Sequence, residues 1–163
     1  MRKHKNLVTG IALIVIGLAV TTAGSIVVHM TEAPPFDSLG RELFPNVPRG
    51  WILTTVAQLV ALGGVLVAMA GVTVAWVYKR TLTWATAMLG ALLFTALMFI
   101  IFAIIPNQFL TLTQATLEWT PRKIFVTIPL VLALNNEVSI SYAVLKDMIS
   151  AGYAAPVLVL VAG

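Results

Sequence analysis

The chain has 163 residues, of which 60% are hydrophobic and 10% are charged, whereas about 25% of residues are charged in a typical soluble domain. It contains no cysteine, which excludes disulfides, thiolate metal sites and cysteine nucleophiles. The net charge of +4 comes from basic residues that flank apolar runs, a pattern that indicates membrane topology rather than nucleic-acid binding. We therefore expect one integral membrane domain over residues 1–163, with the lipid bilayer around it and no nucleic-acid partner.

The first apolar run extends over residues 7–28 and follows the basic start MRKHK. At ~1.5 Å of rise per residue, a helix over this run crosses the roughly 30 Å hydrocarbon core of a bilayer. A secretory signal peptide is the alternative, because TTA before Gly24 resembles a cleavage site. The apolar region of a signal peptide is usually only about 7–15 residues long, so we favour a retained first span.

Two further apolar runs, over residues 51–77 and 82–105, are separated only by YKRT and predict a transmembrane hairpin. Pro106 is expected to end the third span. The first outer loop covers residues 30–50. Basic residues before the first span and between the second and third spans lie on one side of the membrane. This bias predicts a cytoplasmic N-terminus, in a bacterial inner or plasma membrane.

The second outer segment, residues 106–148, contains the stretch KIFVTIPLVLALNNEVSISY. Its apolar part is too short to cross a bilayer as a helix and contains a proline. β-Branched and aromatic residues flank Asn135 and Asn136, a pair that tolerates the positive φ of a tight turn. We expect a β-hairpin outside the lipid, followed by a helix that Ser139 or Ser141 caps.

The last apolar run begins near Ile149 and has too few residues before Gly163 to cross a bilayer. We interpret residues 149–163 as a truncated fourth span. The alternative draws Lys146 and Asp147 into the membrane, where buried charges cost ~2.5–3.5 kcal/mol each. The expected fold is an all-α integral membrane protein, a bundle of four transmembrane helices with an extracytoplasmic cap made of loops and the β-hairpin.

Small residues recur along one face of each of the first two spans. In the first span they are glycines every seven residues, and in the second they follow steps of four and three. Such stripes let two helices approach closely in a membrane. Either the two spans pack on each other within this chain, or one face receives a helix of another subunit. The expected helix-packing residues are Gly10, Gly17, Gly24, Ala57, Ala61, Gly64, Ala68, Gly71 and Ala75.

The three long apolar runs carry no ionisable side chain, which disfavours ion-coupled carriers and pumps, because these need such groups near the membrane midplane. The sequence has no motif for nucleophilic, metal or nucleotide chemistry. We therefore expect no catalytic residue, no metal ligand and no cofactor of the chain's own, but bound lipid. We interpret His29, at the outer end of the first span, as a polar interface anchor. The alternative is that it contacts a shared quinone, haem or chlorophyll.

The second outer segment is unusually apolar for a surface loop, and its large side chains need a cover. The cover is the first outer loop, the membrane surface or another membrane subunit, and we favour the subunit. The expected docking residues are Trp119, Phe125, Asn135 and Asn136. The sequence therefore predicts a non-catalytic accessory or scaffolding subunit of a larger membrane complex, with a respiratory or photosynthetic electron-transfer assembly as the leading candidate. The alternative is a subunit that contacts a quinone, haem or chlorophyll through His29.

Overall fold

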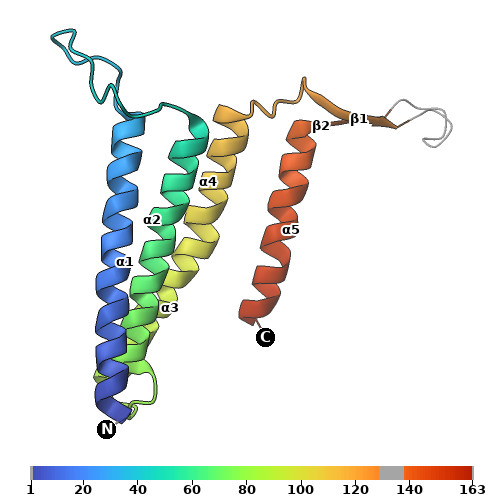
Figure 1. The fold of residues 1–163 in the computed structure, drawn as a ribbon. Helices are drawn as coiled ribbons and strands as arrows, with labels where there is room; N and C mark the ends of the chain where they lie inside the picture. The colour runs from blue at the N-terminus through green and yellow to red at the C-terminus, as the bar shows by residue number, and fades with distance from the viewer. Residues whose placement is uncertain (1, 129–137, 163) are drawn as a thin grey trace. The chain divides into compact units, whose positions relative to one another are not determined.

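The computed structural model describes residues 2–128 and 138–162, and it is mostly helical (Figure 1). Three helices in these ranges are long and apolar enough to cross a membrane, which indicates a membrane-associated protein. They are His4–Glu32, Trp51–Val77 and Trp84–Thr116. The chain divides into two compact units, Met1–Ala96 and Leu97–Gly163.

The first unit contains two antiparallel helices, α1 and α2, which lie side by side (Figure 1). α1 covers Arg2–Glu32. It exceeds the predicted span 7–28 at both ends, because neither the basic start nor the polar end contains a residue that breaks a helix. α2 covers Trp51–Val72 and continues as a π-helical turn, η1, over Thr73–Val77. Together α2 and η1 match the predicted second span.

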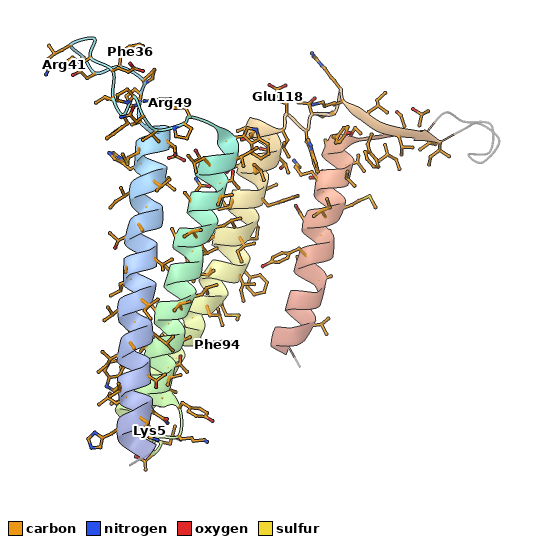
Figure 2. All side chains as sticks on the ribbon, viewed as in Figure 1. Lys5, Phe36, Arg41, Arg49, Phe94 and Glu118 are labelled. Atoms are coloured by element: carbon orange, nitrogen blue, oxygen red, sulfur yellow. The ribbon has the colours of Figure 1, made fainter. Side chains whose placement is uncertain are left out.

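The loop between α1 and α2 is held by its own polar side chains. The Asp37 carboxylate accepts hydrogen bonds from the backbone N–H groups of Leu39 and Arg41, both at 2.8 Å, and pairs with the Arg41 guanidinium. Arg49 donates to three backbone carbonyls, including that of Leu43 at 2.7 Å. Figure 2 shows Arg49 close to the helix ends and Arg41 farther out along the loop. Local contacts therefore order this loop.

A tight turn joins η1 to the third long helix. Lys79 adopts a left-handed conformation with φ 55°, which reverses the chain. Arg80 donates to the backbone carbonyl of Ala75 at 2.9 Å and so satisfies an acceptor at the end of η1. Thr83 and Thr86 exchange side-chain-to-backbone hydrogen bonds of 2.8 and 3.3 Å, in the manner of a capping box. These contacts end one helix and start the next.

The third long helix does not end at Pro106, so this prediction was wrong. Pro106 lies inside this continuous helix, just after the π-helical turn η2. The π-helical turn before it widens the helix and makes room for the ring. Residues 106–116, which were predicted as part of an outer loop, are therefore helical. The successive segments are α3 (Trp84–Phe99), the π-helical turn η2 (Ile100–Ile104), α4 (Ile105–Thr111) and the π-helical turn η3 (Leu112–Thr116).

The second unit contains a small antiparallel sheet, and the two predicted strands are confirmed. β1 covers Ile124–Ile128 and β2 covers Val138–Ser141. The two strands pair with each other along one ladder. The predicted turn residues Asn135 and Asn136 lie outside the described residues.

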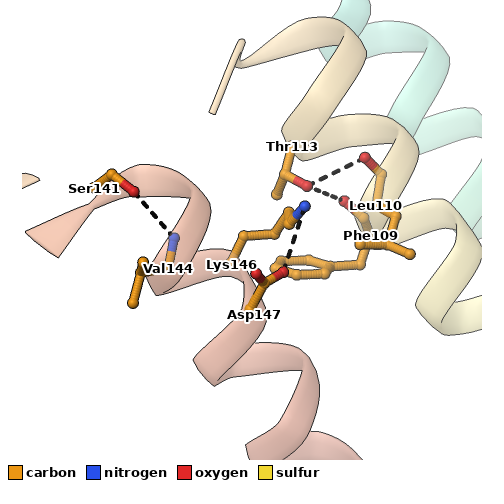
Figure 3. Close-up of polar contacts among 7 residues, drawn as sticks. All are labelled: Phe109, Leu110, Thr113, Ser141, Val144, Lys146 and Asp147. Carbon is orange, nitrogen blue, oxygen red and sulfur yellow. Dashed lines mark hydrogen bonds and ion pairs between the residues drawn. The ribbon is translucent and has the colours of Figure 1, made fainter. Parts of the chain in front are cut away.

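A helix, α5, follows β2 directly and covers Tyr142–Ala162. The Ser141 hydroxyl accepts a hydrogen bond of 3.4 Å from the Val144 N–H (Figure 3). This contact is typical of an N-cap residue. Of the two predicted caps, Ser141 therefore occupies the position that starts the helix.

A fourth membrane span is not shown, because α5 is not among the candidate spans found in the described residues. Near its start α5 carries an ion pair between Lys146 and Asp147, with Nζ and Oδ1 3.5 Å apart. The Lys146 side chain is only 12% exposed and points toward Thr113, whereas that of Asp147 is 73% exposed (Figure 3). The fourth span over residues 149–163 stays a prediction.

Candidate functional site

Small residues make the contact between α1 and α2. A Cβ added at Gly10 would lie 2.6 Å from the Cβ of Ala75, and one added at Gly17 would lie 2.5 Å from the backbone nitrogen of Ala68. At Gly24 the nearest backbone atom of α2 would be 2.8 Å away. Real side chains do not tolerate such distances, so only glycine fits at these three positions.

The second helix contributes complementary glycines to the same contact. A Cβ at Gly64 would meet the Thr21 hydroxyl oxygen at 2.5 Å, and one at Gly71 would meet the Gly10 carbonyl oxygen at 2.7 Å. Both glycines are buried. The structure brings all the predicted helix-packing residues together. Gly10, Gly17 and Gly24 of α1 lie against Ala57, Ala61, Gly64, Ala68, Gly71 and Ala75 of α2 and η1.

Polar side chains close the α1–α2 contact next to the loop. The Thr54 hydroxyl donates to the Thr31 hydroxyl at 3.0 Å, and the Gln58 amide donates to the Glu32 carboxylate at 3.1 Å. Thr31 is buried, and an unpaired buried hydroxyl would cost about 1–3 kcal/mol. The pairing therefore stabilises the helix ends and engages the Glu32 carboxylate.

The α1–α2 contact leaves no room for a ligand. Backbone atoms of the two helices meet at intervals from Gly10 to Gly24. Neither a cofactor nor a file of water molecules fits between helices that approach this closely. The α1–α2 pair therefore offers only its outward faces for contact with a ligand or another helix.

Large apolar side chains are exposed on the third long helix. No residue of α3 is buried. Met88, Leu92 and Phe99 share one face of this helix and are 69%, 67% and 64% exposed. A contiguous apolar face of this kind meets either lipid or another protein.

His29 lies in the last turn of α1 and is exposed. Its ring packs edge-on against Phe44 of the loop, with the ring centroids 6.5 Å apart. Within residues 2–128 and 138–162, no three His, Asp, Glu or Cys side chains gather into a group that could hold a metal ion. The structure therefore places His29 at a helix end, where its imidazole is accessible to the headgroup layer or to a ligand from outside the chain.

An aromatic cluster joins the segment after the third long helix to the hairpin and α5. The Tyr142 ring centroid lies 5.4 Å from that of Trp119 and 5.4 Å from that of Phe125. The Lys123 ammonium lies 6.0 Å from the Tyr142 centroid. Phe125 remains 53% exposed. Tyr142 thus contacts both Trp119 and Phe125, the two predicted docking residues that the structure describes. Tyr142 itself was not predicted from the sequence, and its position directly after a strand was the available signal.

Tyr153 is a second residue that sequence reasoning missed. Its hydroxyl donates a 3.0 Å hydrogen bond to the backbone carbonyl of Ile101 in η2. At the end of η2 the Ile105 N–H bonds to the Ile100 carbonyl, five residues earlier. The next residue in that series is Pro106, which has no N–H to give to Ile101. Tyr153 therefore supplies the missing donor, and its hydroxyl in an otherwise apolar stretch was the only signal.

In the described residues, these features indicate a helical, membrane-associated protein in which α1 and α2 form a closed pair and large apolar side chains are exposed. No protein-family model, curated protein or solved structure matches the chain. Its function is therefore inferred from its own residues.

Proposed function

We propose that the protein is a non-catalytic accessory or scaffolding subunit of a larger membrane complex. A contrast between helices carries this proposal. α1 and α2 meet along a contact closed at the backbone, whereas no residue of α3 is buried. An apolar helix without such a contact gains van der Waals attraction by packing against another membrane protein.

The lack of ionisable groups inside the long helices supports a structural role. Residues 6–28, 51–77 and 84–116 contain no Asp, Glu, Lys, Arg or His. Transport coupled to ions or protons relies on such groups within the membrane. In this proposal the chain acts through contact with neighbouring subunits and lipid rather than through chemistry of its own.

The proposed complex is a respiratory or photosynthetic electron-transfer assembly in a bacterial inner or plasma membrane, with the N-terminus on the cytoplasmic side. Basic residues at Lys5, Lys79 and Arg80 favour this orientation. The class of assembly rests on analogy with complexes that recruit small helical subunits without cofactors. Trp119 and Phe125, together with the hairpin, are the proposed docking residues.

A second candidate function is contact with a quinone, haem or chlorophyll that a neighbouring subunit holds. The position of His29 favours it, because the imidazole is exposed at a helix end and packs against Phe44 of the loop. An accessible imidazole can bond a quinone carbonyl or serve as an axial ligand. This function also requires a partner, so it is a variant of the accessory role.

Purification in a mild detergent from the native membrane tests the accessory role. We expect the wild-type chain to co-migrate with other membrane subunits. Leu92→Ala/Phe99→Ala removes two large apolar side chains from the exposed face of α3 and should release most of these subunits. Leu59→Ala is the matched control, because Leu59 is 60% exposed on α2, and it should keep the complex. A wild-type chain that purifies as a monodisperse monomer would overturn the proposal.

The absorbance spectrum of the purified complex separates the two candidates. His29→Gln should change the spectrum if the imidazole contacts a pigment, and it should weaken retention of a quinone if the ligand is colourless. An intact complex with unchanged spectrum and unchanged quinone content would rule out the ligand-contacting role and keep the accessory one.

A further inference from the structure

Basic residues gather at one end of the first unit. α1 begins with RKHK over residues 2–5, and the turn after η1 contains Lys79 and Arg80. α1 and α2 are antiparallel, and Gly10 meets Ala75 near this end. The helix start and the turn therefore lie at the same end of the helix pair (Figure 1).

The chain supplies no acidic side chain to balance these charges. The sequence contains no Asp or Glu in residues 1–31 or 43–117. In the part of the chain that the structure describes, Lys5, Lys79 and Arg80 form no ion pair. Their countercharge therefore comes from outside the chain.

Local contacts hold two of these cations, Lys79 and Arg80, in defined positions. Arg80 is fixed by its hydrogen bond to a carbonyl of η1. Lys79 is exposed in a left-handed turn, and its ammonium lies 4.9 Å from the centroid of the Tyr78 ring. Trp76 and Tyr78 are 43% and 51% exposed, and such rings favour the headgroup layer of a membrane. In a membrane, the cations beside these rings would reach the level of the lipid phosphates.

We propose that this basic end binds the headgroups of anionic phospholipids. Phosphate oxygens accept the charge-assisted hydrogen bonds that lysine and arginine donate. The opposite end of the helix pair differs in charge, because its loop region carries the acidic residues Glu32, Asp37 and Glu42. There Arg41 pairs with Asp37. The lipid site needs no partner protein, so it does not depend on the proposed role in a complex.

Quenching of tryptophan fluorescence by brominated lipids tests the site in the full chain. Trp51→Phe/Trp119→Phe leaves Trp76 and Trp84, which flank the basic turn, as reporters. The protein is reconstituted in vesicles of phosphatidylcholine and phosphatidylglycerol, with bromine on the acyl chains of one lipid or the other. We expect brominated phosphatidylglycerol to quench more strongly than its mole fraction predicts.

Charge variants in the same background identify the residues. Lys5→Gln/Lys79→Gln removes two exposed cations. Each cation near an anionic surface strengthens the attraction about fivefold, so the preference for phosphatidylglycerol should fall by up to about 25-fold. Arg41→Gln, which removes one cation at the opposite end, is the control and should leave the preference intact.

Three outcomes would overturn the proposal. Equal quenching by the two brominated lipids would show no preference. An unchanged preference in Lys5→Gln/Lys79→Gln would place the lipid elsewhere. Loss of the preference on addition of inorganic phosphate, at constant ionic strength, would assign the site to a free anion instead of a lipid.

Discussion

Two helix contacts in this chain are built in opposite ways. In the first unit α1 and α2 meet through glycine and alanine, with backbone atoms of one helix against backbone atoms of the other. In the second unit, the described residues join α5 to η2 by a side-chain hydrogen bond of 3.0 Å, from the Tyr153 hydroxyl to the Ile101 carbonyl. The first contact is spread over several turns, whereas the second uses a polar atom at one position.

The difference shows how helices associate where the hydrophobic effect does not act. An apolar side chain gains nothing by leaving lipid for another helix, so the helices are held by van der Waals contact or by polar groups. The glycine contact between α1 and α2 spreads its attraction over many atom pairs. A hydrogen bond between membrane helices stabilises by about 0.6 kcal/mol on average. Damage to the α1–α2 contact should therefore cost more than loss of the Tyr153 hydroxyl.

Gly64→Leu should have the largest effect. The new Cβ would lie 2.6 Å from the backbone nitrogen of Thr21, so α1 and α2 must separate. We expect the free energy of unfolding to fall by about 3 kcal/mol or more, measured by steric trapping in bilayers. Leu66→Ala is the control, because Leu66 lies two residues away and is 38% exposed. Equal losses in the two variants would contradict an α1–α2 contact that depends on glycine.

Tyr142→Ala should have the second-largest effect. It removes the ring contacts with Trp119 and Phe125, and aromatic pairs are worth about 0.5–1.5 kcal/mol each, so we expect a loss of about 2 kcal/mol. Amide hydrogen exchange in β1 should accelerate. Phe36→Ala in the first loop, where the ring is 58% exposed, should leave β1 unchanged. Normal protection of β1 in Tyr142→Ala would show that the cluster does not hold the hairpin.

Tyr153→Phe should have a smaller effect, because it removes only the hydroxyl and leaves the Ile101 carbonyl without that donor. We expect a loss of about 1 kcal/mol, visible as faster hydrogen exchange in α5. A double-mutant cycle with Pro106→Ala sharpens the test. The alanine restores a backbone N–H close to Ile101, so Tyr153→Phe should cost less in that background. The same penalty in both backgrounds would separate Tyr153 from the proline.

Thr21→Val should have the smallest effect. The Thr21 hydroxyl donates to the Gly17 carbonyl of its own helix at 2.9 Å and lies 3.3 Å from the Ala61 carbonyl of α2. Loss of this interhelical contact should cost about 0.6 kcal/mol in the steric-trapping measurement. Thr22→Val is the matched control, because Thr22 bonds only to Leu18 of α1. A larger loss in Thr22→Val than in Thr21→Val would assign the effect to the helix itself.

The features that repeat along the chain could be predicted from the sequence. The glycines spaced seven residues apart in α1 are the residues that meet α2, because a helix face is periodic and small residues mark it. The strands over 124–128 and 138–141 follow from β-branched and aromatic residues on either side of a turn signal. Several residues contribute to each pattern, so one exception does not hide it.

The features that depend on one contact between distant residues could not be predicted. The local rule for proline ends a helix at Pro106, but it takes no account of a π-helical turn and a tyrosine hydroxyl from another helix. Arg49 binds carbonyls 16 and 15 residues before it, those of Ala33 and Pro34, and its neighbours in sequence do not indicate which. The docking role of Trp119 and Phe125 stays a prediction.

The spacing of Gly10, Gly17 and Gly24 also limits how α1 can change in length. Each added residue rotates everything beyond it by about 100° around the helix axis. A single-codon insertion between two of these glycines would therefore turn the rest of the face away from α2, which is more damaging than any one substitution. Gain or loss of seven residues would keep the glycines on one face. The length of this helix in related genes should therefore differ by multiples of seven residues or not at all.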